Sequence, residues 1–440
     1  MIRRFTVKGF KSYRNATLPL AELTVLIGAN ASGKSNLIEA LQLLSWIAHG
    51  RRLADLISAL KEREVVIRGT TSNLTYGGGS EFGFECAAAE DASGPEKLLL
   101  ELVLGLSEDG MHIRDEKLWA LDERTDFPLY QVEEAATAYS PEIQVAYNNF
   151  AHGGKKPRIA CIDQQAVFTQ LTTPARFFKQ HEKSQTTIPP ACERLRENLE
   201  AILFLDPVPG RMRDYSFIIE KALRGDGSNV SAVVFDLCTD AAKKQRLLEF
   251  VRSLPEQDIG GIDFLKGPRN EVMVKLFETF GKQGRWMEAP LLSDGTLRVL
   301  AVAAALLSVP EGSLVVIEEI DNGVHPSRAE GLLSNIQKVA VDRKLRVLLT
   351  THNPALLDAI PLSAVPHIVA CYRDPDEGDS RLVRLEDLER YPELVAQGRV
   401  GQLVTRGILD KFVKTRPSAA AKTEKAQQFL DLLDRPPPEQ

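Results

Sequence analysis

The sequence of 440 residues has few cysteines and no long hydrophobic run. Its five cysteines are scattered, with no C-x-x-C pair and no histidine at metal-ligand spacing, so neither a zinc site nor a disulfide framework is predicted. No apolar stretch reaches the roughly 18 residues of a membrane span, and the amino-terminal segment lacks the apolar core of a signal peptide. We therefore expect a cytoplasmic protein with reduced thiols and no membrane contact.

An excess of basic residues is also lacking. The formal net charge is −6, so the whole chain provides no overall attraction to nucleic acid, although a local basic patch can lie within an acidic total. Composition therefore leaves DNA binding open without indicating it. The hydrophobic share of 44% and the charged share of 26% are typical of a globular protein, and the length suits either two or three domains or one larger domain with insertions.

The most informative stretch follows the apolar run Leu23–Ile27 and precedes a helix-like apolar pattern. It reads G-A-N-A-S-G-K-S-N from Gly28 to Asn36, which matches the phosphate-loop pattern G-x-x-x-x-G-K-[ST] in a strand-to-helix context. Glycines let successive N–H groups face one anion, and the helix amino terminus adds positive potential. The sequence therefore predicts a nucleotide site in which Lys34 reaches the β- and γ-phosphates and Ser35 holds Mg²⁺.

A second apolar strand, Val315–Ile317, ends in Glu318 and Glu319. In a phosphate-loop enzyme the first acid would bind Mg²⁺ through water, and the second would orient or deprotonate the attacking water. Two carboxylates this close raise each other's pKa, which suits a base that works near neutral pH. The alternative for this pair alone is a solvated strand end.

Two further sites carry candidate phosphate-binding groups. Ser293 and Gly295 stand at the start of an apolar helix, where a hydroxyl and a backbone N–H form a second anion site. Because one fold needs only one cradle for the γ-phosphate, a second cradle implies another molecule's nucleotide, although an ordinary N-cap is the alternative. His352 follows the strand Val347–Thr350 and could bind the γ-phosphate or the attacking water, the alternative being a helix-capping or core histidine.

The order of predicted elements indicates an α/β fold. Strands alternate with helices after Glu288, which is typical of a parallel sheet, and several strands between Val65 and Leu118 indicate an antiparallel layer. We expect a mixed or parallel sheet beside this antiparallel β layer. The expected divisions are an N-terminal lobe at 1–121, an inserted α+β region at 122–285, a C-terminal lobe at 286–414 and a mobile tail at 415–440.

Taken in order, these motifs resemble one family. The set G-A-N-A-S-G-K-S-N, L-S-D-G-T, V-V-I-E-E-I-D-N-G-V-H-P and L-L-T-T-H-N-P is similar to the ATP-binding-cassette branch of P-loop ATPases, and most similar to the SMC/RecF/OLD-like AAA-type ATPases of prokaryotes. The opening stretch Val7–Tyr13 also resembles that family's F-K-S-F strand. The resemblance implies an ATPase head that uses ATP and Mg²⁺ and forms a homodimer around two ATP molecules.

The resemblance also implies roles for single residues. Glu318 would lie on the Mg²⁺ side of the Walker B strand, Glu319 would be the catalytic acid and His352 the switch histidine. Gln164 is our candidate for the family's glutamine loop, a Mg²⁺ and water ligand, with a surface turn as the alternative. The predicted phosphate loop comprises Gly28, Asn30, Gly33, Lys34, Ser35 and Asn36, and the predicted signature that closes over a partner's ATP comprises Ser293 and Gly295.

Two features of related proteins are lacking. The region between the lobes shows no sustained heptad repeat, so no long coiled-coil arm is predicted. The D-x-D at Asp374–Asp376 lies among proline and glycine and is predicted to be a turn, not part of a TOPRIM nuclease. The family resemblance implies a switch in genome maintenance or antiphage defence with a separate effector protein. The alternatives are an ATP-bound scaffold with little turnover and a RecF-like ATPase that binds DNA through Arg211 and Arg213.

Overall fold

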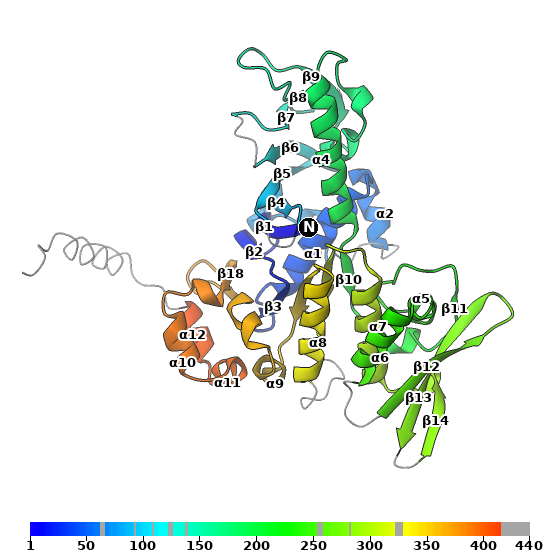
Figure 1. Cartoon of the computed structure of the whole chain (residues 1–440). Helices are drawn as coiled ribbons and strands as arrows, with labels where there is room; N and C mark the ends of the chain where they lie inside the picture. Colours follow the sequence, from blue (N-terminus) through cyan, green and yellow to red (C-terminus); the bar gives the residue numbers. More distant parts are fainter. Residues whose placement is uncertain are drawn as a thin grey trace, which may run out of the picture.

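The structure of the protein, shown in Figure 1, is a computed structural model. It describes residues 1–61, 67–91, 94–107, 110–121, 126–136, 140–252, 258–280, 283–321 and 329–414. The tail predicted at 415–440 therefore lies outside the described residues. In the described part of the chain, no helix combines the length and the hydrophobicity that crossing a membrane would need.

A six-stranded sheet forms the centre of the molecule. Five of its strands are parallel and the last is antiparallel, in the spatial order β10 (Leu203–Leu205), β15 (Leu314–Ile317), β16 (Arg346–Thr350), β3 (Leu23–Ile27), β17 (Ile368–Arg373) and β18 (Ser380–Arg384). Strands β3, β15 and β16 are buried along their whole length, as expected for a parallel sheet that is covered on both faces. The predicted alternation of strands and helices is confirmed.

This central sheet separates two hydrophobic cores. Successive residues of a strand point to opposite faces, so Leu26 joins one core while Val25 and Ile27 join the other. The first core includes helix α1 (Lys34–Ala48) and helix α4 (Glu182–Glu200). The second includes α5 (Val230–Leu237), α6 (Ala241–Arg252), α7 (Asp294–Ser308) and α8 (Ala329–Asp342).

An eight-stranded antiparallel sheet packs on α1 and extends away from the central sheet, with α4 along it (Figure 1). The predicted antiparallel layer is therefore present, and the boundary predicted at residue 121 falls between two strands of this one sheet. The strands, in spatial order, are β2 (Tyr13–Pro19), β1 (Ile2–Phe10), β4 (Glu81–Ala89), β5 (Glu96–Ser107), β6 (Gly110–Ala120), β7 (Tyr130–Glu134), β8 (Glu142–Tyr147) and β9 (Arg158–Ile162).

A third sheet lies beside α5, α6 and α7. Its central strand is β13 (Glu271–Phe280), which pairs with β11 (Ser216–Phe217), β12 (Asp258–Lys266) and β14 (Gln283–Glu288). Short helices complete the described chain: α2 (Leu56–Lys61), α3 (Val167–Gln170), α9 (Pro354–Asp358), α10 (Tyr391–Ala396), α11 (Val400–Thr405) and α12 (Ile408–Lys414). The predicted central α/β sheet and antiparallel layer are confirmed. The region predicted as one insertion at 122–285 is divided among three sheets, because β7, β8 and β9 join the eight-stranded sheet and β10 joins the central sheet.

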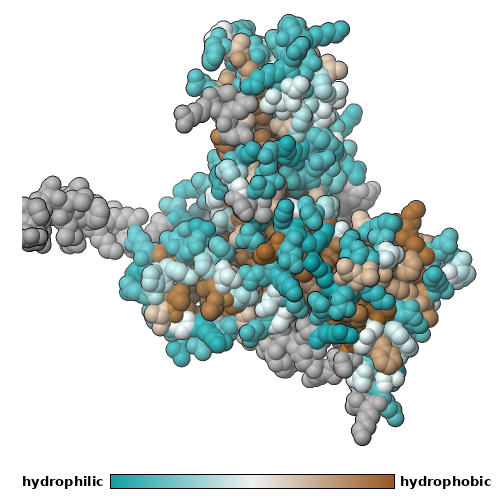
Figure 2. Space-filling view, viewed as in Figure 1, coloured by the Kyte–Doolittle hydropathy of each residue, from teal (hydrophilic) through white to brown (hydrophobic). Residues whose placement is uncertain are grey.

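Most of the surface seen in Figure 2 is hydrophilic, but hydrophobic residues gather on the segment around β11. Tyr215, Phe217 and Ile219 are exposed there, and Ile219 is exposed to 85%. Leu291, two residues before Ser293 of the predicted signature, is also exposed. This apolar surface, defined by Tyr215, Phe217, Ile219 and Leu291, is a candidate contact area.

Candidate functional site

The phosphate loop connects the end of β3 to the start of α1. Gly28 and Gly33 have φ values of 154° and 120°, in the range that favours glycine. A Cβ atom at Gly28 would lie 2.2 Å from the carbonyl oxygen of Cys371, and one at Gly33 would lie 2.3 Å from Oγ of Ser380. Both glycines are therefore required by close contacts with the β17–β18 hairpin as well as by backbone conformation.

We expect Gly33→Ala to abolish nucleotide binding and to lower the melting temperature. The added methyl group would collide with Ser380 and force a φ of 120° on alanine, so the loop would move away from its present course. Calorimetric titration with ADP would measure the loss. Gly210→Ala is a matched control, because no atom lies within 4 Å of its added Cβ. ADP affinity unchanged by Gly33→Ala would contradict the required loop geometry.

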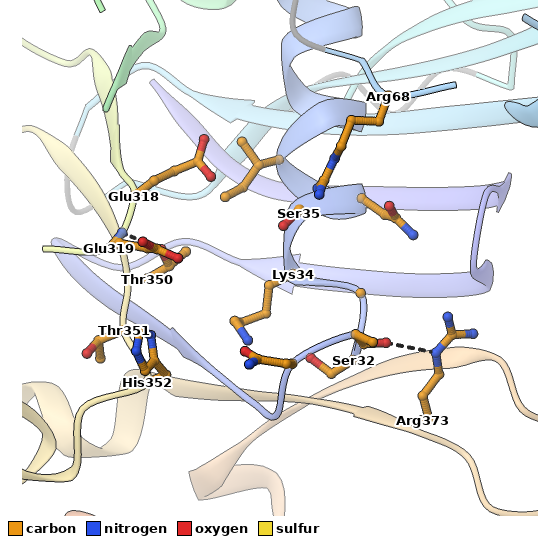
Figure 3. Close-up of a pocket in the computed structure, with 15 residues that line it drawn as sticks. Ser32, Lys34, Ser35, Arg68, Glu318, Glu319, Thr350, Thr351, His352 and Arg373 are labelled. Atoms are coloured by element: carbon orange, nitrogen blue, oxygen red, sulfur yellow. Dashed lines mark hydrogen bonds between the residues drawn. The ribbon is translucent and has the colours of Figure 1, made fainter. Parts of the chain in front are cut away.

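A pocket of about 440 Å³ opens over this loop. Figure 3 shows Lys34 and Ser35 on one side of it and the carboxyl ends of β15 and β16 on the other. Lys34 Nζ donates hydrogen bonds to the carbonyl oxygens of Gly28 (2.6 Å) and Ala29 (3.1 Å), which holds its charge at the loop. The lining residues are Asn30, Ala31, Ser32, Gly33, Lys34, Ser35, Asn36, Ile38, Arg68, Glu318, Glu319, Thr350, Thr351, His352 and Arg373.

Most residues predicted from separate motifs therefore meet in one place. Glu318, Glu319 and His352 line the same pocket as the phosphate loop, although they lie about 300 residues later in the chain. They do so because β3, β15 and β16 are parallel neighbours, so the ends of all three strands reach one edge of the sheet. This edge is where ligands of open α/β sheets bind.

The two acids after β15 differ in their surroundings. The backbone of Glu319 has a φ of +46°, a strained conformation for a residue other than glycine, and its N–H donates to Thr350 Oγ1 at 2.9 Å. Glu318 is half-buried, and its N–H donates to the Leu205 carbonyl at 3.0 Å. The unusual backbone at Glu319 holds the two side chains in distinct positions on the pocket wall.

The pKa of Glu318 is raised to about 7, mainly by burial and also by the neighbouring carboxylates of Asp206 and Glu319, with Arg68 acting in the opposite direction. A cation beside Glu318 would favour its ionised form. Among the described residues, no three His, Cys, Asp or Glu side chains cluster as a metal site. A hydroxyl and a carboxylate that line the same pocket as the phosphate loop fit Mg²⁺, which usually binds one or two carboxylates together with nucleotide phosphates. Ser35 and Glu318 are the residues in the pocket that would hold it.

Gln164 does not lie at this pocket, which corrects its prediction as a metal ligand. Its Oε1 accepts a hydrogen bond from the Ala54 N–H at 3.1 Å, and its Nε2 donates to the Met111 carbonyl at 3.1 Å. The side chain therefore links β6 to the segment that precedes α2. The prediction failed because the position of Gln164 depends on these long-range contacts and not on the local strand end.

His352 and Asp321 lie near each other at the carboxyl edge of the sheet. His352 Nε2 is 3.8 Å from Oδ2 of the buried Asp321, while the ring itself is 57% exposed and borders the pocket. The next residue, Asn353, caps α9 by accepting a hydrogen bond from the Ala355 N–H at 3.0 Å. Asp321 had no role in the sequence predictions, although it belongs to the quoted motif V-V-I-E-E-I-D-N.

The structure adds Arg68 to the site. Its exposed side chain extends toward Ser35 (Figure 3), and its Nε donates to Oε1 of the buried Glu39 at 2.7 Å. Lys11 forms an ion pair with the other oxygen of Glu39. Because Glu39 lies one helical turn after Ser35 on α1, it anchors a second cation beside the phosphate loop. The only sequence signal was a charged residue on an otherwise buried helix face.

The predicted signature lies elsewhere. Ser293 is the N-cap of α7 and accepts a hydrogen bond from the Thr296 N–H at 3.1 Å. Ser293 remains exposed, and neither it nor Gly295 belongs to the pocket lining. Ser293 is therefore an N-cap, and its exposure leaves it accessible to a second molecule.

Two family models match the chain. One, described as "AAA domain, putative AbiEii toxin, Type IV TA system", matches residues 182–358, and another, described as "AAA ATPase domain", matches residues 1–63. The two matched segments contain the three central strands and every pocket residue predicted from sequence. Together with the motif order, these matches support an SMC/RecF-like P-loop ATPase head.

Individual relatives agree with the family models. An "ATP/GTP phosphatase" of Helicobacter pylori is 20% identical over 82% of this chain and 87% of its own length. The DNA replication and repair protein RecF of Gloeobacter violaceus is 44% identical, but over only 16% of each chain. Among solved structures, the SMC head domain from Thermotoga maritima matches at 13% identity with a TM-score of 0.41, covering 87% of this chain and 98% of that one. In its motifs and in these matches, the chain resembles SMC/RecF-like P-loop ATPase heads.

Proposed function

We propose that this SMC/RecF-like P-loop ATPase head binds ATP with Mg²⁺, hydrolyses it, and works as a dimer that closes around two ATP molecules. One observation carries the proposal: the pocket combines the phosphate loop, two acids and a histidine, whereas the exposed Ser293–Gly295 signature lies outside it. A single chain therefore holds most of a phosphoryl-transfer site but not the second anion cradle. The signature of another copy would complete it.

Each pocket residue then has a task in hydrolysis. Backbone N–H groups of the loop and the cations Lys34 and Arg68 bind the phosphates. Ser35 and Glu318 would hold Mg²⁺, which when bound would neutralise phosphate charge. Glu319 orients the attacking water and accepts its proton, and His352 donates a hydrogen bond to the γ-phosphate. Closure depends on the γ-phosphate because both subunits contact it, so its loss opens the dimer.

The apolar surface of Tyr215, Phe217, Ile219 and Leu291 supports the dimer, because it adjoins the signature and a closing partner would cover it. Specific ATPase activity is therefore expected to rise with protein concentration until dimers saturate, because each complete site needs two chains. Steady-state phosphate release, measured over a hundredfold range of concentration alongside light scattering, tests this. ATP binding with constant, negligible turnover at every concentration would instead favour the scaffold alternative.

Direct DNA binding through Arg211 and Arg213 is not supported. Arg211 forms an ion pair with Asp226 at 3.0 Å. Arg213 donates to the Leu292 carbonyl at 2.7 Å and to the Pro290 carbonyl at 3.2 Å, and it forms an ion pair with Asp294. These contacts fix the loop that carries Ser293. Arg213 thus belongs to the support of the signature.

We expect Arg213→Ala to lower dimer-dependent ATPase activity about tenfold, because several charge-assisted hydrogen bonds to the signature loop are lost. Arg211→Ala is the matched control: it removes an exposed ion pair two residues away and should change activity little. Both variants should leave any DNA affinity unchanged in low-salt anisotropy titrations. A selective loss of salt-dependent DNA binding in both variants would revive the RecF-like alternative.

We place this switch in the cytoplasm, in genome maintenance or antiphage defence, with a separate effector protein that receives the signal. The matched family model names a toxin–antitoxin system, and the partial relatives include RecF and the chromosome partition protein Smc of Mycobacterium leprae, 35% identical over 17% of this chain. Co-purification of a tagged Glu319→Gln chain from its native host would test for the effector, because this variant is expected to stay in the closed, ATP-bound state.

A further inference from the structure

The β17–β18 hairpin contacts the back of the phosphate loop. It follows both segments matched by family models and was assigned no role from the sequence. Three successive loop carbonyls, those of Ala31, Ser32 and Gly33, accept hydrogen bonds from side chains outside the loop. A loop whose carbonyls are held from behind directs its N–H groups toward the pocket.

Ser380 makes the shortest of these contacts. Its fully buried Oγ lies 2.6 Å from the Ser32 carbonyl and 2.8 Å from Ser12 Oγ. Because a carbonyl can only accept, the Ser380 proton points to Ser32, and the Ser12 hydroxyl donates to Ser380. Asn36 Nδ2 in turn donates to Ser12 at 2.8 Å. The chain Asn36–Ser12–Ser380–Ser32 therefore begins and ends on the phosphate-loop segment.

Arg373 and Tyr13 hold the carbonyls on either side. Arg373 Nε donates to the Ala31 carbonyl at 3.1 Å, and its Nη1 donates to the Gly378 carbonyl at 2.7 Å within the hairpin turn. The Tyr13 hydroxyl donates to the Gly33 carbonyl at 3.0 Å. Arg373 also borders the nucleotide pocket, whereas Ser380 does not. The effects of Arg373 and Ser380 on nucleotide binding can therefore be measured separately.

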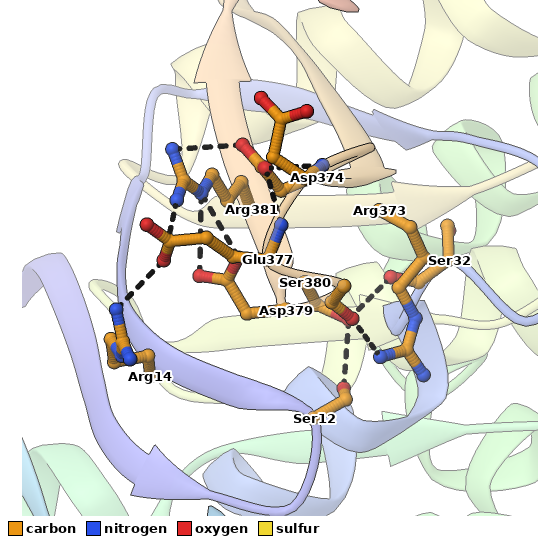
Figure 4. Close-up of polar contacts among 11 residues, drawn as sticks. Ser12, Arg14, Ser32, Arg373, Asp374, Glu377, Asp379, Ser380 and Arg381 are labelled. Carbon is orange, nitrogen blue, oxygen red and sulfur yellow. Dashed lines mark hydrogen bonds and ion pairs between the residues drawn. The ribbon is translucent and has the colours of Figure 1, made fainter.

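Several ion pairs and hydrogen bonds connect the residues of the hairpin turn, as Figure 4 shows. The buried Asp374 forms an ion pair with Arg381 at 3.0 Å. It also accepts hydrogen bonds from the N–H groups of Asp376 and Glu377, each at 3.0 Å. Asp379 also pairs with Arg381, at 3.2 Å. The predicted turn at Asp374–Asp376 is thus confirmed, and its acids fix the strand positions that carry Arg373 and Ser380.

We infer that the β17–β18 hairpin is a positioning device for nucleotide binding, in which Ser380 and Arg373 hold the phosphate loop in its binding conformation. The inference rests on the proposed function. The hairpin lies so close to the phosphate loop that it excludes side chains at Gly28 and Gly33. Loss of either support lets the loop carbonyls turn toward the pocket, which weakens the binding of any nucleotide that carries a β-phosphate.

Ser380→Ala is expected to raise the Kd for ADP and for a non-hydrolysable ATP analogue alike, by about three- to tenfold, because one buried hydrogen bond is lost. The kcat at saturating ATP should stay within about twofold of wild type, since Ser380 touches no reacting group. Arg384→Ala is the matched control, because this arginine of β18 pairs with Asp387 and Glu386 and does not reach the loop. Titration calorimetry, steady-state kinetics and thermal melts are measured on the full chain.

If the Ser380→Ala chain does not fold, variants of the exposed Arg373 test the inference in its place. Arg373→Ala and Arg373→Lys should both weaken ADP binding, because lysine keeps the charge but lacks the Nε–H that binds Ala31. Full rescue by lysine, or wild-type ADP affinity in a folded Ser380→Ala chain, would overturn the inference. If the wild-type chain itself binds neither ADP nor the ATP analogue, the proposed function fails first, so the two failures are distinguishable.

Discussion

Replacing Glu319 by glutamine is expected to lower kcat by about two to four orders of magnitude while leaving ATP binding intact. Glutamine keeps the size and the backbone contact of Glu319 with Thr350, but it cannot accept the proton of the attacking water. Because the γ-phosphate then stays in place, the two heads should remain closed. The same substitution should therefore stop turnover and accumulate an ATP-dependent dimer.

Single-turnover phosphate release and size-exclusion chromatography with light scattering, with and without ATP, measure both effects on one preparation. Glu330→Gln is the matched control, because Glu330 is exposed on α8 and lies outside the pocket lining. An unchanged kcat in Glu319→Gln, or turnover lost without any ATP-dependent dimer, would show that the catalytic acid or the coupling of hydrolysis to opening is assigned wrongly.

The central part of the fold could be predicted because its signals are local. An apolar strand, a glycine loop and an apolar helix adjoin at Gly28–Asn36, and their order alone fixes the β3–α1 unit. The same holds for β15 with its two acids and for β16 with His352. The antiparallel sheet was predicted only in part, because β7 and β8 are short strands separated by irregular segments, and their pairing with β6 and β9 is a matter of tertiary packing.

Site residues that depend on distant contacts were missed or misplaced. Arg68 reaches the pocket through Glu39, 29 residues away, and Ser380 reaches Ser32 across 348 residues. No pattern within a window of the sequence carries such information. Gln164 shows the converse case: a strand end with two glutamines suggested a ligand, but hydrogen bonds to Ala54 and Met111 hold it elsewhere. Local motifs predicted most of the residues that meet in the pocket, whereas the contacts that support them required the structure.

Ser293→Asp should abolish ATPase activity without preventing ATP binding to the same chain. Aspartate caps helices as well as serine does, so α7 keeps its N-cap, but its carboxylate would face the γ-phosphate of the partner's nucleotide and repel it. Lys34→Ala should be inactive for the opposite reason, since it loses phosphate binding in its own pocket. Ser293→Thr keeps both the hydroxyl and the cap and should remain active.

Mixing the two inactive variants distinguishes a composite site from a self-contained one. In a mixed dimer, the Lys34 of the Ser293→Asp chain faces the intact Ser293 of the Lys34→Ala chain, so one of the two sites has no defect. With random pairing, half the dimers are mixed and half their sites are complete, which predicts roughly a quarter of wild-type activity. Activity that stays at zero across all mixing ratios would refute a signature acting in the partner's site, and activity retained by Ser293→Asp alone would refute any role of Ser293 in hydrolysis. The loop at Gly28–Asn36 would then work without a second chain, and the exposed surface beside α7 would need another explanation.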